Sequence, residues 1–384
     1  MDERRDNMPR KHYPGETVGI IGSSLSAAIL AQEAGRLGYR VGSLVLTPDN
    51  PVKQFASWQT IAETYDELAL RHFAGRVDTI ITDTGILSSQ DYQILKEITD
   101  VAMSEDLISI TTDRLLEKAY LDSLQLLVAP FSLVTSIADI KEAVEYIGFP
   151  CILKSTNRHL PNSEKSVIIY SEQDYPQAEA KIEESTCILE AWIPSEKKAS
   201  LTIVRNERGE MLVYPIFEII EAGIDGGTQV RYPVSLHSAI EAEINRIGHV
   251  IADALGLIGS ITMELLITTA GVVYVNDARI GLSDAALFTI GSMSVNHYEA
   301  TVRAVLGLPL PEIRLRSKAA ISLQVPYLNL DSVLTQYMMR TDWGFALFNP
   351  LGHEAHDIVG QVIITGDSIS NCERQIEITD LLKK

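Results

Sequence analysis

A lysine at the end of an apolar stretch, followed by a polar loop, is the first feature of this sequence that could do chemistry. Lys154 ends the stretch "FPCILK", and polar residues separate it from a second apolar stretch that begins at Val167. Many nucleotide-binding proteins present a phosphate loop in this way, usually with glycines that let backbone amides close on the phosphate. No glycine occurs between Lys154 and Val167. The pattern indicates either a phosphate-binding lysine beside an altered loop or a solvated lysine.

Two carboxylates lie in a predicted β-hairpin, "GSITMELLITTAGVVYVNDAR". If residues 268–271 form a four-residue loop, counting back puts Thr262 opposite Asp277, and Glu264 then lies diagonally on the same face as Asp277. Two such carboxylates can share Mg²⁺, which prefers a few carboxylates together with phosphate oxygens. A loop one residue longer or shorter would put the acids on opposite faces. Two exposed acids on a sheet remain the alternative to a metal site.

Glu190 is a lone acid within the apolar stretch "CILEAWI" at residues 187–193. Either its side chain faces the sheet edge, or this strand lines an adenine pocket in which backbone groups bind the base. Both interpretations stay open on these residues alone.

The first part of the chain predicts a small doubly wound domain that ends near residue 112. Apolar strands are expected at residues 17–22, 40–46, 77–83 and 107–110, with helices at 25–39 and 89–103. The first turn, "GSSLSA", keeps only Gly22 of the dinucleotide fingerprint, so dinucleotide binding is not expected there.

The remaining elements alternate between helices and strands, which predicts an α/β protein. A helix is expected from Asp113, another at residues 136–148, and strands around 151–155, 166–170 and 186–193. A hairpin turns at residues 206–209, and a long amphipathic helix begins at a capping box formed by Ser238 and Glu241. A β-rich segment follows residue 312.

Composition narrows the class of partner. The chain has 384 residues, with 51 acidic against 32 basic side chains, so a nucleic-acid-binding surface is not expected. No apolar run is long enough to span a membrane, so no membrane partner is expected either. Three widely spaced cysteines in apolar stretches indicate free buried thiols and a reducing cytoplasm. Residues 1–16 are charged and are predicted to be a disordered tail.

A series of short motifs, in order along the chain, resembles one protein family. The motifs are "TDRLLEKAYL", "GFPCILKS", "CILEAWIP", "RNERGEMLVYP", "IGSITMELLI" and "HYEATVRAVLGLPLP". They resemble the ATP-grasp superfamily and, within it, the 5-(carboxyamino)imidazole ribonucleotide synthase family of purine biosynthesis. The resemblance implies a Rossmann-like domain at residues 17–112, a two-part ATP-grasp domain at 113–311 and a small β-rich domain at 312–384. It also implies a homodimer, which is frequent in this family.

The resemblance also implies an activity and its cofactors. Enzymes of this family use MgATP to phosphorylate bicarbonate, and the carboxyphosphate carboxylates the amine of aminoimidazole ribonucleotide. The implied partners are therefore a nucleotide and a small-molecule substrate, and the implied cofactors are ATP and Mg²⁺. Carried over position by position, the magnesium ligands are Glu264 and Asp277, and the ATP-binding residues are Arg114, Lys154, Glu190, Ala191, Trp192, Ile193, Asn276 and Asp277.

Several positions depart from the family's pattern. The family's glycine-rich loop reads "RHLPNSEK" at residues 158–165, where Pro161 lacks an amide donor and Glu164 adds negative charge. The family's ribose-binding glutamate falls on Lys198, and a histidine near the adenine falls on Glu221.

The expected substrate segments have also changed. The first reads "RIGLSDAAL" at residues 279–287. The second reads "DIVGQ" at residues 357–361, and it is here that the family places a basic pair against the ribonucleotide phosphate. Three functions therefore stay open: a synthase of this family, an ATP-dependent ligase for another substrate, and a paralogue that binds ligands without catalysis.

Overall fold

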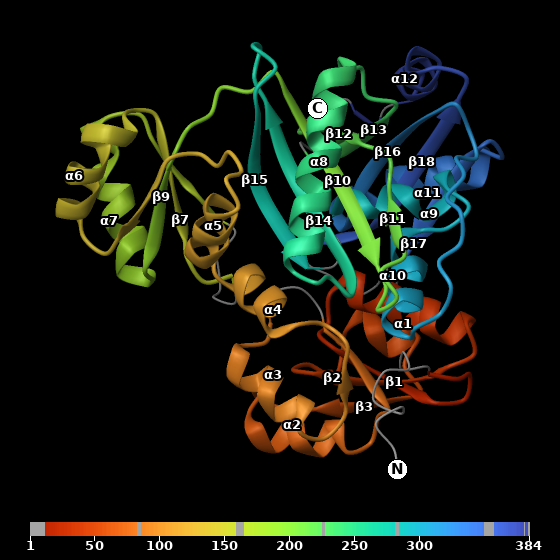
Figure 1. Cartoon of the computed structure of the whole chain (residues 1–384). Coiled ribbons are helices and arrows are strands. Elements are labelled where there is room, and N and C mark those ends of the chain that lie inside the picture. The colour runs from red at the N-terminus through yellow and green to blue at the C-terminus, as the bar shows by residue number, and fades with distance from the viewer. Residues whose placement is uncertain are drawn as a thin grey trace.

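The N-terminal part of the chain forms a parallel sheet with helices on both faces (Figure 1). The structure, a computed structural model, describes residues 12–82, 86–158, 165–224, 227–280, 284–348, 357–379 and 381–382. The elements are β1 (Thr17–Ile21), α1 (Leu25–Arg36), β2 (Arg40–Val45), β3 (Trp58–Ile61), α2 (Glu67–Ala74), β4 (Thr79–Thr82), α3 (Ser89–Lys96) and β5 (Asp100–Val101). The strand order is β3-β2-β1-β4-β5. This doubly wound sheet confirms the predicted α/β class.

Alternate residues of β1 face opposite sides of this sheet. Val18 and Ile20 pack in a core with α1, whereas Ile21 packs in a second core with Leu70 and Phe73 of α2. Because helices cover both faces, the strand is apolar along its length instead of alternating with polar residues.

The segment 107–110, predicted as a strand, is instead part of helix α4 (Glu105–Thr112). The hydroxyl of Ser104 caps this helix and accepts a hydrogen bond from the Leu107 N–H at 3.2 Å. A short apolar run fits a buried strand or a buried helix equally well, and here the cap decides. One edge of the sheet is formed by β5, which lies within the segment 89–103 predicted as a helix.

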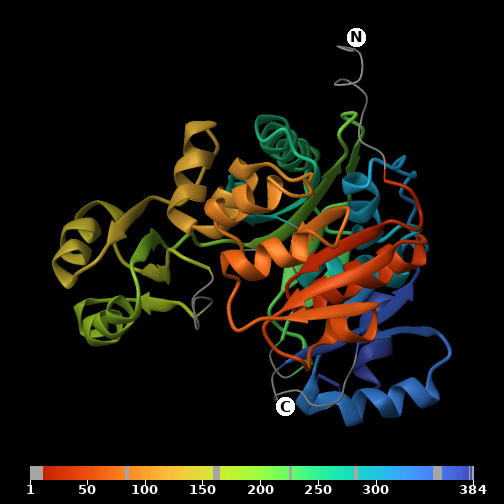
Figure 2. The same ribbon diagram turned by 90° about the horizontal axis from the view of Figure 1, so that it is seen from below.

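Helix α5 (Arg114–Ser123) leads into a small antiparallel sheet. Its elements are β6 (Phe131–Val134), α6 (Ile137–Ile147), β7 (Cys151–Ser155), β8 (Val167–Ile169), α7 (Tyr175–Glu184) and β9 (Cys187–Ala191), with the strand order β6-β9-β7-β8. Ile140 of α6 and Ala178 of α7 pack on Leu153 and Leu189 of the sheet. Figures 1 and 2 show this lobe projecting from the rest of the molecule.

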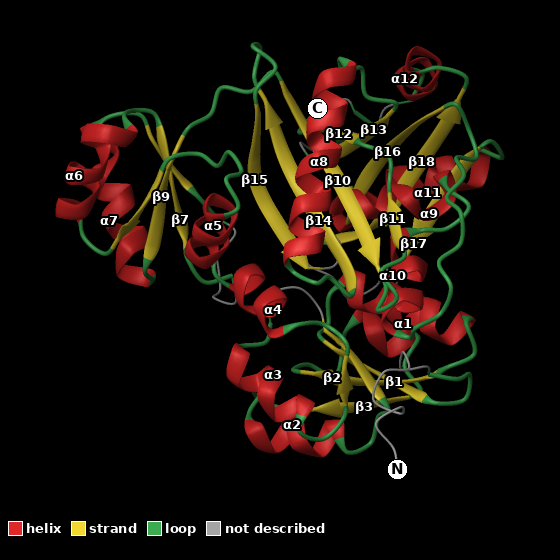
Figure 3. Cartoon of the chain, viewed as in Figure 1, coloured by secondary structure: helices red, strands yellow, loops and turns green. Residues whose placement is uncertain are grey.

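A large antiparallel sheet forms the body of the molecule (Figure 3). It follows the order β15-β14-β10-β12-β13-β16-β18-β17, and β11 pairs with β10. Strands that follow residue 312 therefore extend the same sheet. The strands are β10 (Lys197–Arg205), β11 (Met211–Val213), β12 (Phe217–Ile220), β13 (Gln229–Tyr232), β14 (Gly259–Ile267), β15 (Val273–Ile280), β16 (Ala319–Pro326), β17 (Trp343–Leu347) and β18 (Ile358–Gly366).

Five further helices accompany this sheet. They are α8 (Ser238–Ala254), α9 (Thr289–Ser292), α10 (His297–Val305), α11 (Leu330–Met339) and α12 (Ile369–Glu377) among the described residues. The apolar face predicted for α8 is buried: Ile244, Ile247 and Ile251 pack against the sheet. The predicted capping box at Ser238 is wrong, because the helix begins one residue earlier and the His237 ring accepts the Ala239 N–H at 3.2 Å.

Residues 12–16 contact the N-terminal sheet. His12 Nε2 lies 3.1 Å from Asp100 Oδ2, so residues 12–16 of the predicted disordered tail are fixed on the N-terminal sheet, and residues 1–11 lie outside the described residues. None of the helices in the described ranges is long and apolar enough to cross a membrane.

Candidate functional site

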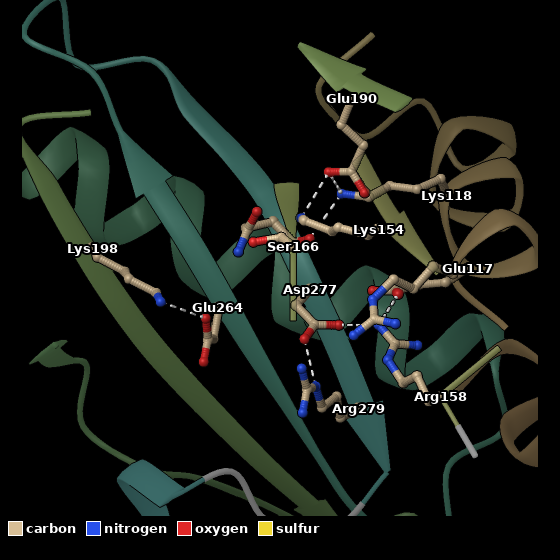
Figure 4. A pocket seen from close by; sticks show the side chains of 12 residues that line it. Glu117, Lys118, Lys154, Arg158, Ser166, Glu190, Lys198, Glu264, Asp277 and Arg279 are labelled. Carbon is tan, nitrogen blue, oxygen red and sulfur yellow. Dashed lines mark hydrogen bonds and ion pairs between the residues drawn. The ribbon is translucent and has the colours of Figure 1, made fainter. Parts of the chain in front are cut away.

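A polar cavity of about 220 Å³ lies between the small sheet and the β15 edge of the large sheet (Figure 4). Helix α5 and strands β7 and β9 contribute from one side, and β10, β14 and β15 from the other. The side chains described around it are all charged or polar, which suits an ionic ligand. They are Arg114, Glu117, Lys118, Lys154, Arg158, Ser166, Glu190, Lys198, Glu264, Asn276, Asp277 and Arg279.

The predicted register of the hairpin is wrong, although Glu264 and Asp277 do lie on the same face. Glu264 pairs directly with Asp277, and Thr262 pairs with Arg279. The loop is one residue longer than predicted, because Ile267 pairs with Val273, and a bulge beside Glu264 accommodates Asn276 as a further extra residue. Without it, Glu264 would face Asn276. The bulge therefore puts both predicted metal acids on the face that lines the cavity.

Asp277 is held between two guanidinium groups (Figure 4). Its Oδ1 accepts from Arg158 Nη2 and its Oδ2 accepts from Arg279 Nε. Burial alone would raise the pKa of Asp277, but Arg158 and Arg279 hold it well below its usual range. Asp277 is therefore ionised, and both of its oxygens are already bonded.

The Arg158 side chain is buried and joins α5 to β15. In addition to Asp277, its Nη2 contacts Glu117 Oε2 at 2.5 Å, and its Nη1 donates to the Thr111 carbonyl at 3.1 Å. Glu117 also accepts the Ala278 N–H. Burial, together with the nearby Asp277 charge, raises the pKa of Glu117 to about 7 despite the opposing effect of Arg158.

Two lysines converge on Glu190. Lys154 Nζ lies 3.1 Å and Lys118 Nζ 3.5 Å from Glu190 Oε2. Burial opposes ionisation, but Lys118 and Lys154 lower the pKa of Glu190 below its usual value. Lys118 also donates to the Asn276 carbonyl at 2.8 Å, so this buried lysine ties α5 to the hairpin. Lys154, which is partly exposed, is the lysine better placed to meet a ligand.

Lys198 pairs with Glu264 across the strands β10 and β14. Its Nζ lies 3.1 Å from Glu264 Oε2 and 3.5 Å from Glu221 Oε1. Burial would lower the pKa of Lys198, but Glu264 and Glu221 raise it above its usual value. The two positions that depart from the family's pattern, Lys198 and Glu221, therefore contact each other.

These contacts do not fit the predicted magnesium site. Glu264 and Asp277 both face cationic side chains, and Asp277 has both oxygens engaged. Across the described parts of the chain, no group of three or more His, Cys, Asp or Glu side chains is placed to hold a metal ion. The two carboxylates that could bind a metal ion are thus already neutralised by cationic side chains of the protein.

The remaining predicted residues fall into two groups. Arg114 lines the cavity, but its Nη1 donates to the Ser155 carbonyl at 2.9 Å, which anchors it to β7. Ala191, Trp192 and Ile193 do not line the cavity. The N–H groups of Ala191 and Trp192 donate to the carbonyls of Pro130 and Pro150, so these two amides are not directed at a base. That Ala191, Trp192 and Ile193 line an adenine pocket stays a prediction.

Parts of two predicted segments lie outside the described residues. Residues 159–164 of the altered phosphate loop and 281–283 of the substrate loop are among them. The predicted segment at residues 357–361 is described in full: Asp357 is exposed and Ile358 begins β18, so this segment provides no cation.

Sequence reasoning missed Glu117 and Lys118 as site residues. Arg114, Glu117 and Lys118 stand at positions i, i+3 and i+4 of α5, which puts all three on one helix face. That spacing was the available signal, but on a charged helix it also describes an ordinary solvated face.

Comparison with known proteins places two domains on this chain. A ribonucleotide synthetase preATP-grasp domain matches residues 15–112, and an ATP-grasp domain matches residues 119–298. The chain is 29% identical over 298 residues to the N5-carboxyaminoimidazole ribonucleotide synthase of Bacillus subtilis, which is 78% of each protein. It is 25% identical over 364 residues to the same enzyme of Staphylococcus aureus strain N315, covering 94% of this chain and 96% of that protein.

Solved structures give the same result. The ADP complex of an N5-carboxyaminoimidazole ribonucleotide synthetase superposes with a TM-score of 0.90 at 26% identity, covering 97% of this chain and 98% of that one. An Aspergillus clavatus synthase in complex with ADP and aminoimidazole ribonucleotide has a TM-score of 0.86 at 18% identity, covering 96% and 99%. The second likeness is one of fold.

Proposed function

Because the chain belongs to the ATP-grasp superfamily, with a preATP-grasp domain before its ATP-grasp domain, we propose that it is an ATP-dependent ligase of the N5-carboxyaminoimidazole ribonucleotide synthase kind. The observation that carries the proposal is the cation-rich cavity between the two sheets, lined by the predicted residues Lys154, Glu190 and Asp277. The relative solved with ADP has the same fold over nearly its whole length. The proposed ligand of the cavity is ATP.

In this proposal, the cationic side chains on the two sides of the cavity have different roles. Lys154 and Arg158, on the side of the small sheet, meet the phosphates, while Lys198 and Arg279 neutralise them from the large sheet. The γ-phosphoryl group passes from ATP to bicarbonate, and the substrate amine then attacks the carboxyl carbon of carboxyphosphate and expels phosphate. Glu264 and Asp277 would hold magnesium only if the cations that already contact them were displaced.

The test is phosphate release from ATP in the presence of aminoimidazole ribonucleotide and bicarbonate. Release that requires both co-substrates and is lost in Lys154→Met supports the proposal. The matched control is Lys318→Met, at an exposed lysine that does not line the cavity. Release that is the same with and without the ribonucleotide contradicts it. The homodimer that the resemblance implies is a separate prediction, which sedimentation equilibrium tests.

A second candidate function is nucleotide binding without carboxylation. It is favoured by the segment 357–361, where Asp357 and Ile358 stand in place of a basic pair that would hold a ribonucleotide phosphate. The same assay separates the two candidates. ATP binding by a protein that shows no ribonucleotide-dependent phosphate release selects the second.

A further inference from the structure

We infer that side-chain cations take the place of magnesium in this cavity, so that the protein binds a nucleotide polyphosphate without a divalent cation. The inference rests on the proposed function in one respect, namely that the cavity receives a nucleotide. It adds the form of the ligand: free ATP or ADP binds as well as the magnesium complex does, because the site needs no metal ion.

The first support is the contact made by each acid that could ligate a metal. Both oxygens of Asp277 accept from guanidinium groups, one from Arg158 and one from Arg279. Glu264 is approached by the ammonium group of Lys198 at 3.1 Å. A metal ion can bind here only by displacing cations that would then remain inside the cavity without their carboxylates, which is unfavourable.

The second support is the charge balance of the cavity. The lining side chains that the structure describes include six cations (Arg114, Lys118, Lys154, Arg158, Lys198 and Arg279) and four acids (Glu117, Glu190, Glu264 and Asp277). The formal excess is therefore two positive charges, the charge of one magnesium ion. Adding a divalent cation would raise the positive charge of a site that already carries this excess.

The third support is the chemistry of the groups that face the ligand. The partly exposed Lys154 can meet a phosphate as a point charge, and the buried guanidinium group of Arg158 adds positive charge at the same cavity. Arg158 is held by Glu117, Asp277 and the Thr111 carbonyl, so its position is fixed before a ligand arrives. Phosphoryl groups need positioning and positive charge, and these side chains provide both.

The experiment is a calorimetric titration of ATP in excess EDTA and, separately, in excess magnesium chloride. For the wild-type chain the two dissociation constants should agree within about threefold. In Arg158→Gly, binding in EDTA should weaken about tenfold to a hundredfold, and magnesium should restore part of it because Asp277 becomes accessible. Arg314→Gly, at an exposed loop arginine, is the matched control and should bind as the wild type does in both buffers.

Arg158→Lys, which keeps the charge, serves as a second variant should the glycine variant unfold. It should weaken binding in EDTA less than Arg158→Gly does, while its thermal unfolding stays close to that of the wild type. Wild-type binding that is more than about tenfold tighter with magnesium overturns the inference and leaves the proposed function standing. Unchanged binding in EDTA by a folded Arg158→Gly also overturns it. No binding in either buffer overturns the nucleotide site itself.

Discussion

The guanidinium group of Arg158 contacts the carboxylates of both Glu117 and Asp277, and so joins helix α5 to strand β15 across the cavity. These contacts connect Arg158 to residues that lie 41 and 119 positions away in the sequence. Arg158 therefore makes these contacts only in the folded protein.

The first prediction concerns Asp277. Asp277→Asn should lower the free energy of unfolding by about 3 kcal/mol, because it leaves the buried Arg158 and the adjacent Arg279 without their shared carboxylate. Urea denaturation measures this change. Inorganic pyrophosphate should recover more stability in the variant than in the wild type, since it supplies the missing negative charge. Equal stability of the two proteins would show that the ion pairs contribute nothing.

The second prediction separates two lysines that both contact Glu190. Lys118 is fully buried and donates to the Asn276 carbonyl, so Lys118→Met should lower the free energy of unfolding by about 2 to 4 kcal/mol. Lys154 is more exposed, and Lys154→Met should cost about 1 kcal/mol but weaken ATP binding about tenfold. Chemical denaturation and ATP titration of both variants check the prediction. The reverse pattern would mean that the lysines have been assigned the wrong roles.

The third prediction concerns pH. His297 of α10 is fully buried against the ring of Tyr214, and burial lowers the pKa of His297 well below its usual value. The unfolded chain takes up a proton near pH 6.5 and the folded chain does not. Stability should therefore fall as pH decreases below about 6.5, by up to about 1.4 kcal/mol per pH unit from this residue.

Comparing His297→Phe with the wild type isolates this contribution. The variant should lose that part of the pH dependence, while the same substitution at the exposed His72 should keep it. Urea denaturation at several values between about pH 5 and pH 8 provides the measurement. Parallel stability curves for His297→Phe and the wild type would rule the effect out.

How much the sequence could predict follows from the range of the interactions. Lys154 and Glu190 could be found because they stand in apolar strands where a charge is conspicuous. Lys118 and Glu117 could not, because burial is decided by the hairpin that packs on α5. The contact of Lys198 with Glu264 depends on sheet register, which a bulge can alter. Residues 107–110 show the same limit for secondary structure, where a single cap outweighed an apolar run.

The central claim is that the polar cavity binds the phosphates of a nucleotide, and calorimetric titration of ATP into the wild-type chain tests it most directly. We predict one ATP per chain with a dissociation constant above roughly 10 μM, equivalent to about −7 kcal/mol, because the glycines of the expected phosphate loop are missing. Pyrophosphate should compete with ATP for this site. The absence of both a binding heat and a thermal shift at millimolar ATP would contradict the claim.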